Sequence, residues 1–259
     1  MDASLAAVHA SAEGRHWWFR ARRRIVAGLA ARVLPTGRRA RVVDVGCGTG
    51  ATAASFADAH DVVGVDASPD SVAQARARFP GVRFVLGDGP HALPPSEGDI
   101  DLVLIMDVLE HVEDDRALLE PWLRRLKPGA HLILTVPGEM RLWSPHDVRM
   151  GHYRRYERDS LDRLLAGMPA EVLLVSPFNT RLHPLVRAAR WVASARGRGL
   201  AAAGTDVFVP PAPVNSVLER VFGGEAERLQ RALDGRAAPY PRGVSWVAVL
   251  RRTDEPARG

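Results

Sequence analysis

Three glycines in one short loop are the clearest indication of chemistry in the sequence. Gly46, Gly48 and Gly50 follow a β-branched run and precede a stretch of helical character. Glycine lets the backbone approach a ligand closely, and the start of a helix offers unpaired N–H groups and a positive dipole end. Asp66 lies 20 residues beyond Gly46, where an acid that binds ribose is expected. Because Ala51 also completes a G-x-G-x-x-A pattern, the spacing predicts a nucleotide-type cofactor without choosing which one.

Three histidines are candidates for the proton-transfer chemistry that imidazole supports near neutral pH. His146 and His152 lie in a polar segment, residues 138–158, and His111 follows an apolar run. Each could instead cap a helix or sit in a loop, and His111 could simply orient the local helix. A metal site formed by His146, Asp147 and His152 matches no known zinc spacing, so we expect no metal there.

Among these histidines, His152 is our first choice for a catalytic base. Gly151 before it permits an unusual backbone turn, and Tyr153 and Tyr156 after it could fix its ring. The other two histidines remain alternatives.

These residues must be positioned by an alternation of strands and helices. Apolar, β-branched runs alternate with segments whose apolar residues recur every three to four positions. Such an alternation is typical of a parallel sheet that is covered on both faces. We therefore predict the α/β class, with a doubly wound, mostly parallel sheet. The expected strands of this part occupy residues 41–45, 61–66, 82–86, 100–106 and 131–136.

The remaining segments surround this α/β core, which we place at residues 41–177 with the insertion at 138–158. Residues 1–40 are predicted to form an N-terminal helical lid. Residues 178–243 are predicted to form a helical insertion on the substrate side, and residues 244–259 the last strand and a tail.

Composition excludes several classes of protein. Hydrophobic residues make up 46% of the 259 residues and charged residues 25%, as in ordinary globular proteins. The single cysteine, Cys47, excludes an internal disulfide framework, and no apolar run approaches the roughly 20 residues that span a bilayer. We therefore expect a cytoplasmic protein. The net charge of +5 rests on arginine, with Lys127 the only lysine, and no basic stretch carries the interleaved aromatics of a nucleic-acid site.

Five motifs in a fixed order resemble those of class I S-adenosylmethionine-dependent methyltransferases. They cover about residues 40–137 and comprise Val42–Gly50, Val63–Pro69, Gly87–Gly89, Asp107–Val112 and Leu126–Ala130. Two outer segments, His16–Arg20 and His146–Tyr156, resemble a bacterial subgroup that acts on small molecules. The resemblance implies a seven-stranded Rossmann-like sheet and S-adenosyl-L-methionine as the cofactor.

The resemblance also implies roles for individual residues. The glycine loop is expected beneath the methionine part of the cofactor, Asp66 at the ribose hydroxyls and Asp88 at the adenine amino group. Asp107 is expected at the reaction centre, and Arg22 or a neighbouring arginine at the cofactor carboxylate. The full expected cofactor site comprises Arg22, Asp44, Gly46, Cys47, Gly48, Gly50, Asp66, Ala67, Asp88, Gly89 and Asp107.

The resulting functional hypothesis is methyl transfer to an oxygen or nitrogen of a small molecule, such as a specialised metabolite, a sugar or a lipid-linked intermediate. A nucleic-acid or protein methyltransferase is one alternative. A NAD-dependent dehydrogenase and a non-catalytic nucleotide-binding module are the others. The arginines and apolar residues between 181 and 198 fit a pocket lid or a homodimer contact, and a membrane-surface contact is less expected.

Overall fold

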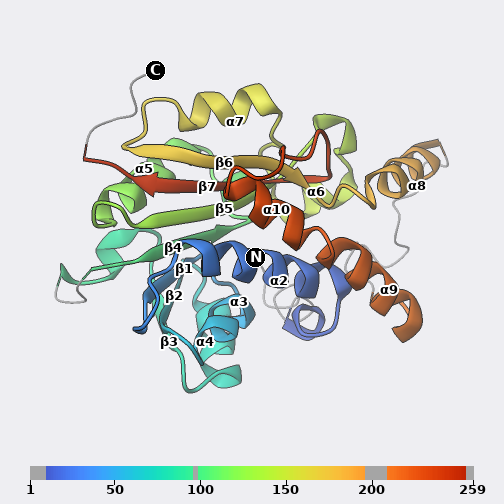
Figure 1. Ribbon diagram of the computed structural model, residues 1–259. Coiled ribbons are helices and arrows are strands. Elements are labelled where there is room, and N and C mark those ends of the chain that lie inside the picture. Colours follow the sequence, from blue (N-terminus) through green and yellow to red (C-terminus); the bar gives the residue numbers. More distant parts are fainter. Residues whose placement is uncertain (1–9, 96–98, 196–208, 255–259) are drawn as a thin grey trace.

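The computed structural model describes residues 10–95, 99–195 and 209–254, with the backbone alone at 193–195. Its strands are β1 (Arg41–Val45), β2 (Asp61–Asp66), β3 (Arg83–Leu86), β4 (Leu102–Met106), β5 (His131–Pro137), β6 (Ala170–Phe178) and β7 (Ser245–Arg252). They form one sheet in the order β3-β2-β1-β4-β5-β7-β6 (Figure 1). β7 runs antiparallel to β5 and β6, and the other neighbours are parallel. The predicted doubly wound, mostly parallel seven-stranded sheet is confirmed.

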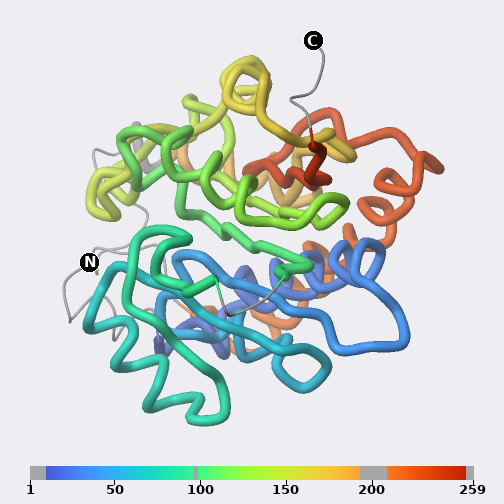
Figure 2. Tube along the Cα trace, turned by 90° about the vertical axis from the view of Figure 1, so that its left-hand side faces the viewer, coloured from blue at the N-terminus to red at the C-terminus, as the bar shows by residue number. Residues whose placement is uncertain are grey.

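The strand order reverses at the centre of the sheet. β1 pairs with β2 on one side and with β4 on the other, so Val43 lies between Val63 and Val103. Figure 2 shows the blue-to-cyan first part of the chain below most of the green-to-red second part. Ligands of doubly wound folds bind outside the carboxyl ends of the strands at such a reversal. The loop after β1 and the chain after β4 meet at this edge.

Two amphipathic helices, α5 (Asp115–Arg125) and α7 (Arg158–Leu165), cover one face of the sheet. Trp122 and Leu161 are fully buried there against the strands. Asp114 begins α5 as an N-cap, since its side chain accepts a hydrogen bond from the Ala117 amide.

The other face is covered by α2 (Trp17–Val33), α3 (Ala51–Phe56), α9 (Ala212–Gly223) and α10 (Ala226–Leu233). Ile25 and Leu29 recur at helical spacing on α2 and are fully buried. They share one apolar cluster with Phe222 of α9 and Leu229 of α10. The N-terminal helix and the second half of the 178–243 segment therefore pack on each other as part of the core.

Helix α4 (Pro69–Arg78) packs against β2 and β3, where Val72 and Ala75 share an apolar cluster with Phe84. Ser68 begins α4 as its N-cap, because its side chain accepts a hydrogen bond from the amide of Ser71. Arg196 and Arg198, which belong to the predicted amphipathic segment, lie outside the described residues. Within the described ranges no helix combines the length and the apolar character needed to cross a membrane. The remaining helices lie near the ends of the strands and are η1 (Pro90–Ala92), η3 (Leu109–His111), η4 (Met140–Leu142), α6 (Pro145–Met150) and α8 (His183–Ala195).

Gly50 gives a stability prediction. Its φ is +90°, and a Cβ there would lie 2.7 Å from Phe84 Cζ and 3.0 Å from Ala75 Cβ. Gly50→Ala therefore adds an overpacking penalty of about 1–3 kcal/mol to a left-handed-backbone penalty of about 1–2 kcal/mol. Gly37→Ala is the matched control, because Gly37 has φ +80° and open space around it. Equal losses of unfolding free energy in denaturant titrations would contradict the packing argument.

Candidate active site

A cavity of about 530 Å³ lies at the reversal of the sheet. The glycine loop after β1 and the start of α2 line one part of it, and η3, α6 and α8 line the rest. Six of the predicted cofactor residues face this cavity, namely Arg22, Asp44, Gly46, Cys47, Gly48 and Asp107. The predicted histidines His111, His146 and His152 also line it. The sequence predicts the cofactor residues and the acid–base candidates on separate grounds, and residues of both groups line the same cavity.

Asp44 is the most unusual carboxylate at the cofactor end. Its side chain is buried, and its Oδ2 has no hydrogen-bond partner. Burial raises the pKa of the Asp44 carboxyl to about 7, against the lowering effect of Arg22. A buried carboxylate oxygen without a partner favours binding of a cationic group from a ligand.

The glycine loop is held close to the chain that follows β4. A Cβ at Gly46 would lie 2.4 Å from Val108 Cγ2, so a larger residue would push the two segments apart. The Gly46 and Cys47 amides both donate to the Val65 carbonyl, at 2.8 and 3.1 Å. Burial raises the pKa of the Cys47 thiol, which packs with Phe84 as a small apolar residue.

Asp66 holds the glycine loop through hydrogen bonds to backbone amides. Its two carboxylate oxygens accept hydrogen bonds from the Gly48 and Ser68 amides, each at 2.8 Å. Asp88 is exposed, and its Oδ1 lies 3.2 Å from Nε2 of His91 at the surface. Five predicted cofactor residues are thus outside the cavity lining, namely Gly50, Asp66, Ala67, Asp88 and Gly89. Their roles toward the cofactor stay predictions.

Arg22 and Asp107 form an ion pair inside the cavity. The guanidinium of Arg22 lies over the Trp18 ring, 4.6 Å from its centroid. Asp107 has φ +56°, in the left-handed region that few non-glycine residues adopt. Arg22 was predicted to meet a cofactor carboxylate, and here its partner is a carboxylate of the chain itself.

The N-terminal segment crosses the glycine loop through a carboxylate that the sequence did not single out. Glu13 Oε2 accepts hydrogen bonds from Thr49 Oγ1 and from the Arg78 guanidinium. Asn215 of α9 fixes the start of α2, since its Oδ1 accepts from the Trp17 amide at 2.9 Å. Glu13 and Trp17 both line the cavity.

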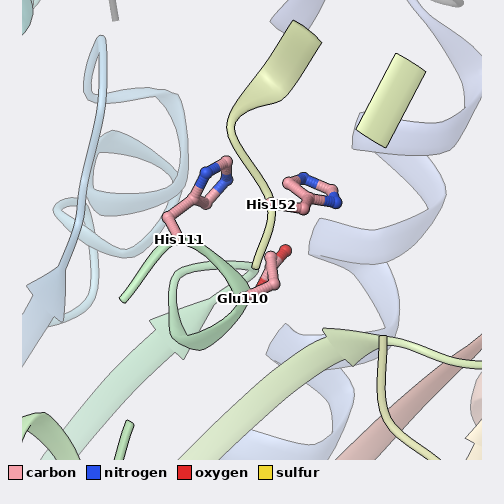
Figure 3. A group of neighbouring side chains, drawn as sticks. All are labelled: Glu110, His111 and His152. Atoms are coloured by element: carbon pink, nitrogen blue, oxygen red, sulfur yellow. The ribbon is translucent and has the colours of Figure 1, made fainter. Parts of the chain in front are cut away.

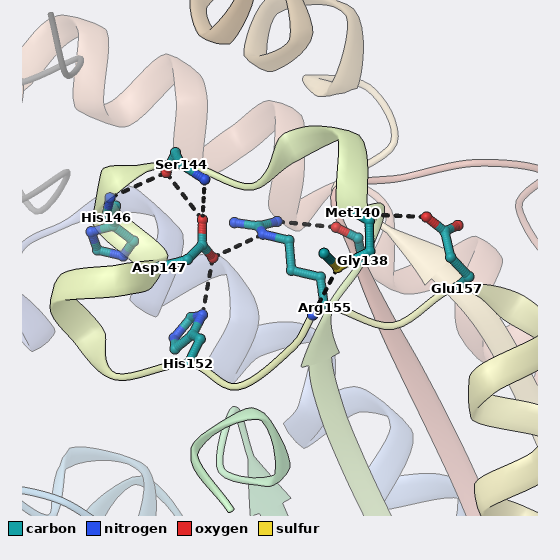
Figure 4. A network of polar contacts seen from close by, with 8 residues as sticks. All are labelled: Gly138, Met140, Ser144, His146, Asp147, His152, Arg155 and Glu157. Atoms are coloured by element: carbon teal, nitrogen blue, oxygen red, sulfur yellow. Dashed lines mark hydrogen bonds and ion pairs between the residues drawn. The ribbon is translucent and has the colours of Figure 1, made fainter. Parts of the chain in front are cut away.

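A buried carboxylate positions His152 at the opposite end of the cavity. Asp147 Oδ1 lies 3.0 Å from His152 Nδ1 and accepts from Arg155 Nε at 2.8 Å, while its Oδ2 accepts from the amide and hydroxyl of Ser144 (Figure 4). Burial alone would raise the pKa of Asp147, but the hydrogen bond from His152 and the charge of Arg155 hold that pKa well below its usual range. An ionised carboxylate only accepts hydrogen bonds, so Nδ1 of His152 donates to it, and in a neutral imidazole Nε2 would then be the acceptor.

Two groups beside His152 have displaced pKa values. Burial and the neighbouring His152 lower the pKa of His111 to about 4, and the two ring centroids are 4.6 Å apart. Burial and the Asp107 carboxylate raise the pKa of Glu110 well above its usual range. His146 is farther away, with its ring centroid 6.4 Å from that of His152. Figure 3 shows Glu110 and His111 on η3 beside His152.

The prediction that tyrosines fix the His152 ring is wrong. Tyr153 is exposed and lies beside the Arg154 guanidinium, and the Tyr156 hydroxyl donates to Asp115 Oδ2 at 2.7 Å. Asp147 performs that role instead. The sequence pattern Ser144-x-x-Asp147 is that of a helix cap, and the structure confirms the capping box at the start of α6. The predicted turn at Gly151 is confirmed, with φ +71°.

A family model described as a methyltransferase domain matches residues 42–129, which include β1, β2, β3 and β4 with the glycine loop. Residues 42–129 therefore form a domain of the S-adenosylmethionine-dependent methyltransferase family. For this part of the chain the predicted family is confirmed, and with it the predicted cofactor, S-adenosyl-L-methionine.

The names of the relatives of this chain indicate different small-molecule substrates. It is 36% identical over 134 residues to demethylmenaquinone methyltransferase of Beutenbergia cavernae, covering 50% of this chain and 53% of that one. It is 37% identical over 123 residues to trans-aconitate 2-methyltransferase of Methylobacterium nodulans, covering 46% of each. The solved structure of the [4+2]-cyclase SpnF superposes with a TM-score of 0.60 over 96% of this chain and 93% of that one, at 20% identity, which shows a shared fold alone. The chain spans about half the length of the curated relatives it matches.

The residues present fit the cofactor of this methyltransferase family. S-adenosyl-L-methionine carries an ammonium group, and the partnerless Oδ2 of buried Asp44 is suited to receive it. The backbone of Gly46 and Gly48 borders the same space without side chains. When bound, the cofactor supplies an activated methyl group on a sulfonium.

The raised pKa of Asp44 gives a binding prediction. Below about pH 7 the carboxyl is protonated in the free protein, and a cationic group would bind only after the proton leaves. Affinity for S-adenosyl-L-methionine should therefore fall roughly tenfold between pH 7.5 and pH 6, following the titration of one group. Calorimetry at several pH values measures this. Asp44→Asn should bind S-adenosyl-L-methionine weakly at both pH values. If the affinity of this variant still depended on pH as that of the wild type does, the assignment to Asp44 would be contradicted.

Asp66 gives a second binding prediction. Asp66→Asn keeps the shape of the side chain but removes one acceptor oxygen, so affinity for S-adenosyl-L-methionine should fall by about 1.5–3 kcal/mol. Asp70→Asn, an equal charge change on the exposed first turn of α4, is the matched control. Because Asp66 also holds the Gly48 and Ser68 amides, thermal unfolding should be measured in parallel. Wild-type affinity in a folded Asp66→Asn protein would remove Asp66 from the ribose site.

Proposed function

We propose that this chain transfers a methyl group from S-adenosyl-L-methionine to an oxygen or nitrogen of a small molecule. The observation that carries the proposal is the single cavity that joins the glycine loop and Asp44 to the histidines of η3 and α6. Its volume of about 530 Å³ lies within the range of about 300–1,000 Å³ that is usual for small-molecule sites.

The chain's own contribution to the reaction is alignment and handling of a proton. Alignment of reacting groups can lower a barrier by about 7–11 kcal/mol. Trp17, Trp18 and Met106 line the cavity and would shield the reacting groups from water. His152 lines the cavity and is held by Asp147 through Nδ1, so it is proposed to assist loss of the acceptor's proton through Nε2.

Several surface arginines are already paired within the chain, which supports a small acceptor over nucleic acid. Arg38 donates to both carboxylate oxygens of Asp101, at 2.8 and 2.6 Å, and Arg39 lies 3.1 Å from Asp61. Such pairs reduce the positive field that draws a polyanion. The named relatives above act on demethylmenaquinone and trans-aconitate, both small molecules.

A survey of acceptors tests the proposal. Purified protein is incubated with S-adenosyl-L-methionine and panels of small hydroxylated, carboxylated and amine compounds, and formation of S-adenosylhomocysteine is measured. Parallel reactions contain tRNA, DNA or a protein mixture. Turnover restricted to the macromolecules would overturn the small-molecule assignment, and cofactor binding without turnover in any reaction would overturn the proposed activity.

A substitution at His152 tests its role once an acceptor is known. His152→Ala should lower kcat by roughly 10²–10⁴-fold, the usual contribution of acid–base groups, with cofactor affinity near that of wild type. Tyr153→Ala is the control, because Tyr153 is adjacent but exposed. A loss of cofactor affinity equal to the loss of kcat would show that His152 supports the cofactor rather than the acceptor.

A further inference from the structure

Three side chains beside the proposed acceptor site offer ligand atoms of the kind that bind transition metals. Glu110, His111 and His152 each present one such atom, and the three atoms all lie within 4.8 Å of one another (Figure 3). All three residues line the cavity. Two imidazoles and one carboxylate on a single side of an ion leave its other positions open, as in catalytic zinc and non-haem iron sites.

His152 is held in the way that metal-binding histidines usually are. In such sites the second ring nitrogen commonly donates to a carboxylate or a backbone carbonyl, which fixes the ring and the tautomer. His152 uses Nδ1 for Asp147 at 3.0 Å, so its Nε2 remains to bind an ion.

The environment of the Glu110 carboxyl group also indicates a bound cation. Glu110 is 1% exposed, and its Oε2 has no hydrogen-bond partner. A buried carboxylate oxygen without a partner is costly unless something binds it. The nearby cations already have partners, since Arg22 pairs with Asp107 and Arg155 with Asp147. Glu110 is thus a buried carboxyl group that neither of these arginines pairs with and whose Oε2 has no partner.

We propose that Glu110, His111 and His152 bind one divalent transition-metal ion whose open positions take an oxygen atom of the acceptor. The inference rests on the proposed function and deepens it, because it favours an oxygen acceptor and says how His152 assists proton loss. An ion of this kind makes a bound hydroxyl more acidic. The acceptor proton leaves to water, the oxygen forms the bond to the methyl carbon, and the electron pair of the broken carbon–sulfur bond stays on sulfur. No sequence motif predicts this site, and it differs from the His146, Asp147 and His152 set considered above.

Metal binding is tested on the full chain without any acceptor. Protein treated with a chelator and then dialysed is titrated with Co²⁺, followed by visible absorption, and with Zn²⁺ and Mn²⁺, followed by calorimetry. We expect one ion per chain, and at least tenfold weaker binding in Glu110→Gln and in His111→Ala. Asp147→Asn, which leaves the three ligands in place, should weaken binding by about 10–100-fold. His91→Ala, which removes an exposed histidine beside a carboxylate, should bind like wild type.

The outcomes separate this inference from the proposed function. No stoichiometric binding by wild type, or equal binding in folded Glu110→Gln and His111→Ala proteins, overturns the site; circular dichroism and cofactor binding report folding. If the ion binds at these residues but chelation leaves methyl transfer unchanged, the acceptor role is overturned. Metal binding that is lost in the variants, in a protein without methyl transfer to any acceptor, upholds the site and overturns the proposed function. Metal-dependent transfer to an oxygen atom supports both.

Discussion

The position of β1 between β2 and β4 is the constraint on which the site depends. Parallel pairing on both sides of β1 makes the chain leave the sheet in opposite directions at one edge, which opens space there. The glycine loop leaves β1 at that edge, and Asp107 and η3 follow β4 beside it. The contact between Gly46 and Val108 keeps these two segments together. The cofactor half and the acceptor half of the cavity are consequently neighbours in the sheet although about 60 residues apart in the chain.

Distant parts of the chain close this edge through charged contacts more than apolar ones. Glu13 joins the N-terminal segment to Arg78 of α4, Arg22 of α2 pairs with Asp107, and Asp147 joins α6 to Arg155. The apolar core holds the sheet and its helices together, and the ion pairs hold the walls of the cavity. Charged groups can also orient a polar ligand there, which apolar contacts could not do.

The fold could be predicted because strand–helix alternation and a glycine loop leave strong patterns in sequence. The cofactor end of the site was accessible for the same reason, through Gly46, Gly48 and Asp44. The acceptor end is only partly accessible from sequence: the histidines stand out, but nothing in the spacing shows that Asp147 orients His152 or that Glu110 is buried beside it. Their significance arises from burial and from the neighbours that the fold brings to them, which spacing does not encode. Tyr153 and Tyr156 lie as near His152 in sequence as Asp147 does, but their side chains point elsewhere.

The place of β7 in the sheet bears on how the protein folds during synthesis. β6 pairs with β7 and, among the described residues, lies at the edge of the sheet, while β7 is separated from it by 66 residues of chain. As the polypeptide leaves the ribosome, β1 to β5 can join before β7 exists, which leaves the edge of β5 open, and β6 must wait without its partner. Open strand edges promote pairing with other chains. The interval between synthesis of β6 and of β7 is therefore when this protein is most exposed to aggregation and has most need of a chaperone.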